Sequence, residues 1–124
     1  MTVAILRQGN YLIASIQSDL SDSEVVELRR ELAELVGRHR LRGIVIDVAA
    51  LDVIDSFVTR ALSTIVLTAK LRGAETVIVG IHPDVAIAIV QFRLNLEALR
   101  VALDLDAAIA LLDRLTQGEA KDGG

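Results

Sequence analysis

The sequence predicts a single α/β domain built on a mainly parallel sheet, with an antiparallel hairpin strand at its N-terminus. The 124 residues suit one domain with one hydrophobic core. Strand-like segments alternate with segments whose apolar residues recur at helical spacing, which is typical of a parallel sheet covered by helices. No low-complexity linker or internal repeat divides the chain. We expect about five strands and four helices within residues 1–116, and a flexible polar tail at residues 117–124.

The first third of the chain predicts a hairpin followed by a helix. Residues 2–7 and 11–17 are strand-like, and the Gly-Asn pair between them is a turn signal. Ser21 and Glu24 have the spacing of a capping box, which predicts a helix start. Apolar residues then recur at helical spacing as far as Gly37, where we expect the helix to end: Val25, Leu28, Leu32, Leu35 and Val36.

The middle of the chain predicts a central strand and a second helix. Residues 43–50 form a β-branched run without polar alternation before Asp47, as expected for a strand covered on both faces. After Asp55, apolar residues return to helical spacing. This second helix is expected to stop at Gly73, which suits a C-terminal cap.

The remaining segments predict two more strands and two more helices. Residues 76–81 repeat the strand pattern, and Pro83 suits the first turn of a helix running to about Phe92. Residues 99–103 suit a short strand. Asp104 is placed to cap a last helix, whose buried face is expected to hold Ile109, Leu112 and Leu115.

The composition argues against several classes of function. The absence of cysteine excludes disulfides and thiolate chemistry, and two histidines, His39 and His82, are too few for a typical zinc site. A net charge of −4 with 2% aromatic residues argues against nucleic-acid binding. Charged residues interrupt every long apolar run, so no membrane span is expected. The N-terminus lacks the pattern of a signal peptide, and we expect a cytoplasmic protein without cofactors.

Polar residues gather where the central strand gives way to the second helix. Asp52, Asp55 and Ser56 lie in this βα connection, and functional sites of parallel sheets lie at the carboxyl ends of the strands. The simplest role of Ser56 is to cap the helix. A hydrolytic serine would need a glycine-flanked turn and an oriented histidine, whereas Ser56 stands between Asp55 and Phe57. We therefore expect no catalytic serine here.

Two further chemical roles remain open for residues near this connection. Asp47 could join Asp52 and Asp55 in a magnesium site, or it could point elsewhere from the strand. His82, at the end of a strand, could act as a base or simply support the turn. His39, near a helix end, complements the helix dipole and is given no role. No phosphate-binding glycine motif occurs, which argues against nucleotide hydrolysis.

The second helix is expected to have a buried face and a contact face. The buried face is predicted to hold Val58, Leu62, Ile65 and Ala69. The neighbouring flank, which we expect to contact partners, holds Arg60, Ser63, Thr64 and Leu67.

Two segments of the chain occur together in one known family: residues 43–62, GIVIDVAALDVIDSFVTRAL, and residues 70–86, KLRGAETVIVGIHPDVA. Through them the chain resembles the STAS family, the sulphate-transporter and anti-sigma-factor-antagonist domains, over nearly its whole length. In that family an Asp-Ser pair opens a helix and the serine accepts a phosphate. The pair falls here on Asp55 and Ser56.

The residues after the serine point to one subgroup of this family. Many simple antagonists follow the serine with a small residue and a glycine, whereas this chain has Phe57 and Val58. In this respect, and in the segment GIHPDVAIAIV, it looks more like the single-domain scaffold proteins of the stressosome. The surroundings of the phosphosite are then expected to include Asp52, Asp55, Phe57, Thr59 and Arg60. Thr59 is a lesser candidate for modification, since its hydroxyl can bond back to the helix backbone.

The resemblance implies a non-catalytic protein that assembles with STAS-domain sensor paralogues of the RsbR type. It also implies sequestration of a serine/threonine switch kinase of the RsbT type, release on phosphorylation of Ser56, and a phosphatase that reverses the modification. A large hetero-assembly or homo-oligomer is expected. Two alternatives remain: a stand-alone antagonist that binds an anti-sigma kinase directly, and a small α/β enzyme that depends on His82 or Asp55.

Overall fold

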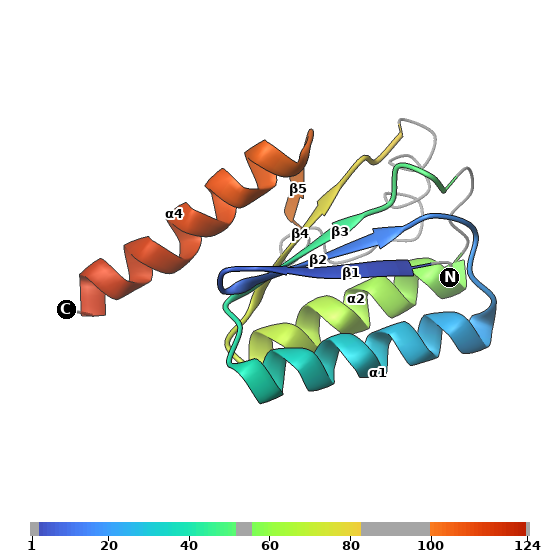
Figure 1. The fold of residues 1–124 in the computed structure, drawn as a ribbon, viewed down its shortest axis with the longest axis horizontal. Helices are drawn as coiled ribbons and strands as arrows, with labels where there is room; N and C mark the ends of the chain where they lie inside the picture. The colour runs from blue at the N-terminus through green and yellow to red at the C-terminus, as the bar shows by residue number, and fades with distance from the viewer. Residues whose placement is uncertain (1–2, 52–55, 83–99, 124) are drawn as a thin grey trace.

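A five-stranded sheet with helices on both faces forms the structure, a computed structural model that describes residues 3–51, 56–82 and 100–123 (Figure 1). The described elements, in chain order, are β1 (Val3–Gln8), β2 (Tyr11–Ile16), α1 (Asp22–His39), β3 (Gly43–Asp47), α2 (Ser56–Leu71), β4 (Glu75–Val79), β5 (Arg100–Ala102) and α4 (Leu105–Gly123). The predicted helix from Pro83 to about Phe92 lies outside the described residues, which contain three of the four expected helices.

The sheet has the strand order β1-β2-β3-β4-β5. β1 pairs antiparallel with β2, and the other neighbouring strands are parallel. Gly9, in the turn between β1 and β2, has a φ of 60°, a left-handed conformation that glycine adopts without steric cost. The predicted hairpin and the mainly parallel sheet are therefore confirmed.

The α1 helix begins as predicted and ends later. The Ser21 hydroxyl accepts a hydrogen bond from the Glu24 backbone N–H, and the Ser21 N–H donates to the Glu24 carboxylate, which completes the capping box. The helix continues through Gly37 to His39, with Arg40 in the left-handed conformation. A side chain at Gly37 would collide with the Arg72 guanidinium. The expected end at Gly37 was wrong because Arg40 takes the left-handed cap position, and its N–H donates to the Val36 carbonyl.

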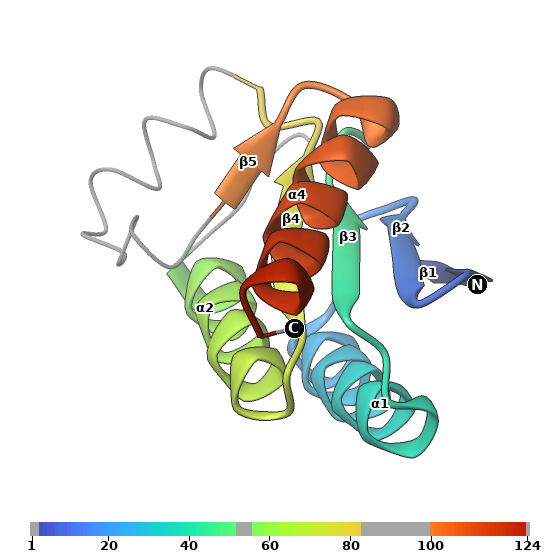
Figure 2. The ribbon, with the colours of Figure 1, turned by 90° about the vertical axis from the view of Figure 1, so that its left-hand side faces the viewer.

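The sheet separates the core into two layers, one on each of its faces. α1 and α2 lie together against one face of the sheet, and α4 lies on the other (Figures 1 and 2). In β3, Ile44 and Ile46 join the α1–α2 layer while Val45 joins the α4 layer, and all three are fully buried. The uninterrupted apolar run predicted for this strand therefore arises from cover on both faces.

The ends of α2 and α4 follow the predicted signals with one extension. Gly73, with a φ of 88°, follows the last turn of α2, and the Ala74 N–H donates to the Ala69 carbonyl at 2.9 Å. The Asp104 carboxylate accepts from the Ala107 N–H at 2.9 Å and caps α4 as expected. α4 continues to Gly123, past residue 116, where the sequence predicted the folded domain to end.

Candidate functional site

The candidate phosphoacceptor opens a helix at the carboxyl end of the central strand. Ser56 is the first residue of α2, and β3 ends at Asp47. Asp52 and Asp55 lie outside the described residues. The first turn of α2 presents backbone N–H groups and the positive end of the helix dipole, which favour an anionic group. The backbone at Ser56 therefore has the position predicted for it.

The start of the connection from β3 to α2 is held by local hydrogen bonds. The Asp47 carboxylate accepts from the Ala49 N–H at 2.9 Å, a turn that aspartate forms readily. The Val48 N–H donates to the Val79 carbonyl of β4 at 3.0 Å, and the Leu51 N–H donates to the Val48 carbonyl at 3.0 Å. Asp47 thus has a structural role in this turn.

The residues after β4 contact the same turn from the side. Gly80 has a φ of 79°, and a Cβ there would stand 2.7 Å from the Ala49 Cβ. His82 Nε2 lies 2.8 Å from the Ala49 carbonyl oxygen. Because a carbonyl can only accept, Nε2 carries the proton and donates it. This contact supports the interpretation of His82 as a residue that supports the turn.

Around Ser56 the predicted surface residues separate into exposed and buried ones. Phe57 and Arg60 are exposed, Phe57 with 39% of its surface accessible. Thr59 is fully buried at 0%, beneath the helix. Thr59, expected among the surroundings of the phosphosite, therefore has a hydroxyl that is not accessible from the surface in this conformation. The helical turn places residues 57 and 60 outward and residue 59 inward.

The rest of α2 has the two faces predicted for it. Leu62, Ile65 and Ala69 are buried in the core, and Val58 packs against it. On the expected contact flank, Arg60, Thr64 and Leu67 are exposed and Ser63 is half-buried. Leu67 leaves 55% of its surface accessible.

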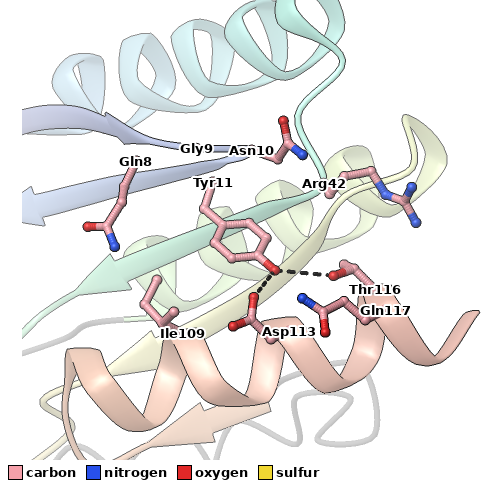
Figure 3. Close-up of a pocket in the computed structure, with 9 residues that line it drawn as sticks. All are labelled: Gln8, Gly9, Asn10, Tyr11, Arg42, Ile109, Asp113, Thr116 and Gln117. Carbon is pink, nitrogen blue, oxygen red and sulfur yellow. Dashed lines mark hydrogen bonds between the residues drawn. The ribbon is translucent and has the colours of Figure 1, made fainter. Parts of the chain in front are cut away.

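A second polar site, which the sequence did not predict, lies at the opposite end of the sheet. A hollow of about 480 Å³ lies between the β1–β2 turn and α4, lined by Gln8, Gly9, Asn10, Tyr11, Arg42, Ile109, Asp113, Thr116 and Gln117 (Figure 3). The Tyr11 hydroxyl donates to the Asp113 carboxylate at 2.5 Å and lies 3.1 Å from the Thr116 hydroxyl. These side chains connect the start of β2 to α4.

The hydrogen bonds of this second site leave one proton to be shared. Since the Tyr11 hydroxyl donates to Asp113, the Thr116 hydroxyl has one proton for two acceptors, the Tyr11 oxygen and the Leu112 carbonyl oxygen at 2.9 Å. Burial and the bond to Asp113 raise the pKa of Tyr11 above its ordinary value of 10.0. Tyr11 therefore stays protonated as a donor throughout the neutral range.

The described part of the chain has neither a cluster of metal ligands nor a helix that could span a membrane. No group of three or more histidine, cysteine, aspartate or glutamate residues there is arranged to hold a metal ion. No helix among the described residues is long and apolar enough to cross a membrane.

Comparison with known proteins gives a consistent set of relatives. A model of the STAS domain matches residues 2–119. A serine-to-glutamate variant of RsbS from Moorella thermoacetica is 35% identical with a TM-score of 0.84, over 94% of this chain and 99% of that chain. A chain from a structure of the stressosome, described as a signal integration and transduction hub, is 32% identical with a TM-score of 0.75, over 91% and 98%.

A more distant structure shares the fold alone. The anti-sigma factor antagonist SpoIIAA in its unphosphorylated form is 10% identical with a TM-score of 0.68, over 92% of this chain and 97% of that chain. No curated protein matches this chain in a sequence comparison.

Proposed function

Since the chain belongs to the STAS domain family and is an RsbS-like member of it, we propose that it is a non-catalytic scaffold and antagonist in stress signalling. In this proposal it assembles with RsbR-like STAS sensor paralogues in the cytoplasm and sequesters an RsbT-like serine/threonine kinase. Phosphorylation of Ser56 by that kinase helps to release it, and a phosphatase restores the unmodified form.

The observation that carries the proposal is the position of Ser56. It opens α2 at the carboxyl end of a central strand, and the exposed side chains of Phe57 and Arg60 stand beside it. A kinase must bind the chain around the hydroxyl that it modifies, and this end of a parallel sheet is where such surfaces form. The similarity to an RsbS variant with glutamate in place of a serine adds support, because glutamate introduces the negative charge of a phosphate.

The physical effect of the phosphate is expected at the partner surface and not in the fold. The helix dipole stabilises an exposed anion at this position by about 0.3 to 1 kcal/mol. The nearby acidic residues in the sequence, Asp52 and Asp55, oppose the added charge of about −1.5 to −2. These opposing terms are similar in size, so the domain should stay folded. A docked kinase would instead be displaced by repulsion and desolvation.

Assembly is supported by apolar side chains that the isolated chain leaves exposed. Leu67 and Leu71 on α2 and Leu103 after β5 are more than half accessible. These residues, with a hydrophobic content of 52%, suit a protein that buries further surface against copies or paralogues.

Size-exclusion chromatography with light scattering tests the assembly, with the chain alone and mixed with a purified RsbR-like STAS protein. We expect a large complex in the mixture. A monomer or dimer in both samples would instead support a stand-alone antagonist that binds an anti-sigma kinase directly.

Kinase retention tests the switch. Ser56→Ala should bind a purified RsbT-like kinase as the wild type does, and Ser56→Asp should bind it about tenfold more weakly or worse. Both variants should keep the wild-type circular dichroism spectrum and melting temperature. Equal kinase affinity of Ser56→Asp and Ser56→Ala would contradict a charge-based switch at this position.

A further inference from the structure

The two outer strands of the described sheet differ in how open their edges are. β5 spans only three residues, and its Arg100 forms an ion pair with Glu75 of β4 at 3.7 Å. β1 spans six residues, pairs one to one with β2 without a bulge, and contains no proline. Short length, charges, bulges and proline are the features that keep an edge strand from pairing with another chain. Among the described strands, β1 is therefore the edge that is open to a further strand (Figure 2).

The backbone of β1 alternates between groups that bond to β2 and groups that point away from it. The two-residue turn after β1 closes on the pair Gln8–Tyr11, whose backbone groups bond across the turn. In an antiparallel ladder every second pair exchanges hydrogen bonds in this way. Counted back from Gln8, the residues between these pairs are Arg7, Ile5 and Val3. Their N–H and C=O groups are therefore directed to the open side.

The side chains of β1 add apolar surface beside this open edge. Leu6 leaves 61% of its surface accessible and stands opposite Ile13, on the face of the sheet that carries α4. Ala4, two residues away on the same face, is also exposed. α4 packs against β3, β4 and β5 and does not cover these side chains (Figure 2). Exposed apolar side chains beside unpaired backbone groups suit the addition of another strand.

We propose that two copies of this chain associate through their β1 strands, which pair antiparallel about a two-fold axis at Ile5. The two sheets then form one continuous sheet. In this register Ala4 of one copy faces Leu6 of the other, and Val3 faces Arg7. The inference concerns the chain alone and does not depend on the proposed function.

The sequence of β1 is self-complementary in this register. A two-fold axis brings the same patch of both copies together, and directly opposite residues of an antiparallel pair lie on the same face. With the axis at Ile5, the residues with outward backbone groups meet one another, and Leu6 covers Ala4 of the other copy.

The single charge of β1 also fits this register. The two Arg7 residues are four positions apart along the strand pair, about 14 Å at 3.4 Å per residue. This separation exceeds the Debye length of about 8 to 10 Å at physiological salt, so their repulsion is largely screened. An axis at Arg7 would place the two charges directly opposite each other, which destabilises a strand pair.

Sedimentation of the purified chain over a range of concentrations tests the association. One strand pair is a small interface, so we expect a dimer that dissociates on dilution. Leu6→Lys should raise the dissociation constant at least about tenfold, because a charged side chain on an edge opposes pairing. Val101→Lys is the matched control, since Val101 is 55% exposed on the other edge strand, and it should leave the constant unchanged. Both variants should keep the wild-type circular dichroism spectrum.

Introduced cysteines test the register, because the sequence contains none of its own. Opposite residues of a pair that exchanges no hydrogen bonds have Cα atoms about 4.5 Å apart, within disulfide range, whereas diagonal neighbours are about 7 to 8 Å apart. Ala4→Cys and Leu6→Cys chains are mixed in equal amounts and oxidised, and the disulfide-linked dimers are identified by mass. We expect the mixed dimer to exceed the share that random pairing gives.

The outcomes separate this proposal from its alternatives. A wild type that is monomeric at every concentration, or a dimer that Leu6→Lys leaves intact, would overturn it. Random or same-variant disulfides would exclude the register at Ile5. If Leu6→Lys abolishes only assembly with a purified RsbR-like STAS protein, a paralogue occupies this edge and the second-copy proposal fails. Absence of phosphate at Ser56 would reject the proposed function and leave the pairing of β1 untouched.

Discussion

The two ends of the sheet use polar side chains in different ways. At the carboxyl end, Asp47 and His82 bond to the backbone of Ala49, at positions open to solvent. At the amino end, Tyr11 bonds to the side chains of Asp113 and Thr116, and the three groups are at least partly buried. The first arrangement holds the turn that follows β3, and the second connects a helix to the sheet.

This difference indicates how the molecule separates function from stability. The polar contacts of Ala49 are open to solvent, so they contribute little to the free energy of unfolding. The contacts of α4 are partly buried, and in such surroundings a hydrogen bond is stronger than in water and an unpaired group more costly. Changes at the carboxyl end should therefore alter signalling, whereas changes at the amino end should alter stability.

The largest contrast is expected in phosphate incorporation. Ser56→Ala should lose it completely with an RsbT-like kinase and ATP, while Tyr11→Phe should keep the wild-type level, because Tyr11 is at the other end of the sheet. Mass spectrometry of the phosphosites measures both, and Thr59 should carry no phosphate because it is buried. Equal phosphate incorporation into the wild type and Ser56→Ala would show that another residue is modified, and would contradict a signalling role for this end of the sheet.

A large stability effect is expected on the α4 side of the sheet. Leu112 is fully buried between α4 and the strands, so Leu112→Ala should lower the free energy of unfolding by about 2 to 5 kcal/mol. Leu6→Ala is the control, because 61% of Leu6 is exposed, and its effect should stay within about 0.5 kcal/mol. Urea unfolding followed by circular dichroism provides the comparison, and similar values for both variants would refute the assignment of the α4 core.

A smaller effect is expected from the hydroxyl that joins β2 to α4. Tyr11→Phe removes its bonds to Asp113 and Thr116 and keeps the ring, so the loss should be about 0.5 to 1.5 kcal/mol. A double-mutant cycle with Asp113→Asn, measured by urea unfolding, isolates the coupling between the two side chains. Strict additivity would show that the bond contributes nothing to stability.

The smallest effect is a loss of stability at high pH. The pKa of Tyr11 is raised in the folded state above 10.0, chiefly by burial and then by Asp113. A raised pKa means that the contribution of Tyr11 is present below pH 10.0 and is lost as the pH rises through the folded-state value. Tyr11 is the only tyrosine and there is no tryptophan, so ultraviolet absorbance follows its ionisation directly.

The alkaline titration has a simple control. Urea unfolding across the same pH range measures the free energy of unfolding. In Tyr11→Phe, the loss of this free energy that is due to ionisation of Tyr11 should be absent. An absorbance midpoint for the folded protein at or below that of the urea-unfolded chain would contradict a raised pKa for Tyr11.

Local signals in the sequence were sufficient for most of the fold. The capping box at Ser21, the cap at Asp104 and the glycine after α2 depend on residues within a few positions of each other, so their chemistry is visible in the sequence. The apolar run of β3 likewise indicated a strand covered on both faces. The Asp-Ser pair at the start of α2 identified the candidate site through its resemblance to a family.

The tertiary structure decided the features that join distant residues. The α1 helix continues past Gly37 to a left-handed cap at Arg40, and Thr59 turns inward although its neighbours Phe57 and Arg60 face solvent. Tyr11 meets Asp113 across 102 positions of sequence, and His82 meets Ala49 across 33. No local pattern encodes such pairs, because their free energy depends on which elements the packed core brings together and on how far it excludes water. The sequence by itself determined where helices and strands form, while the packing of those elements determined which polar groups meet.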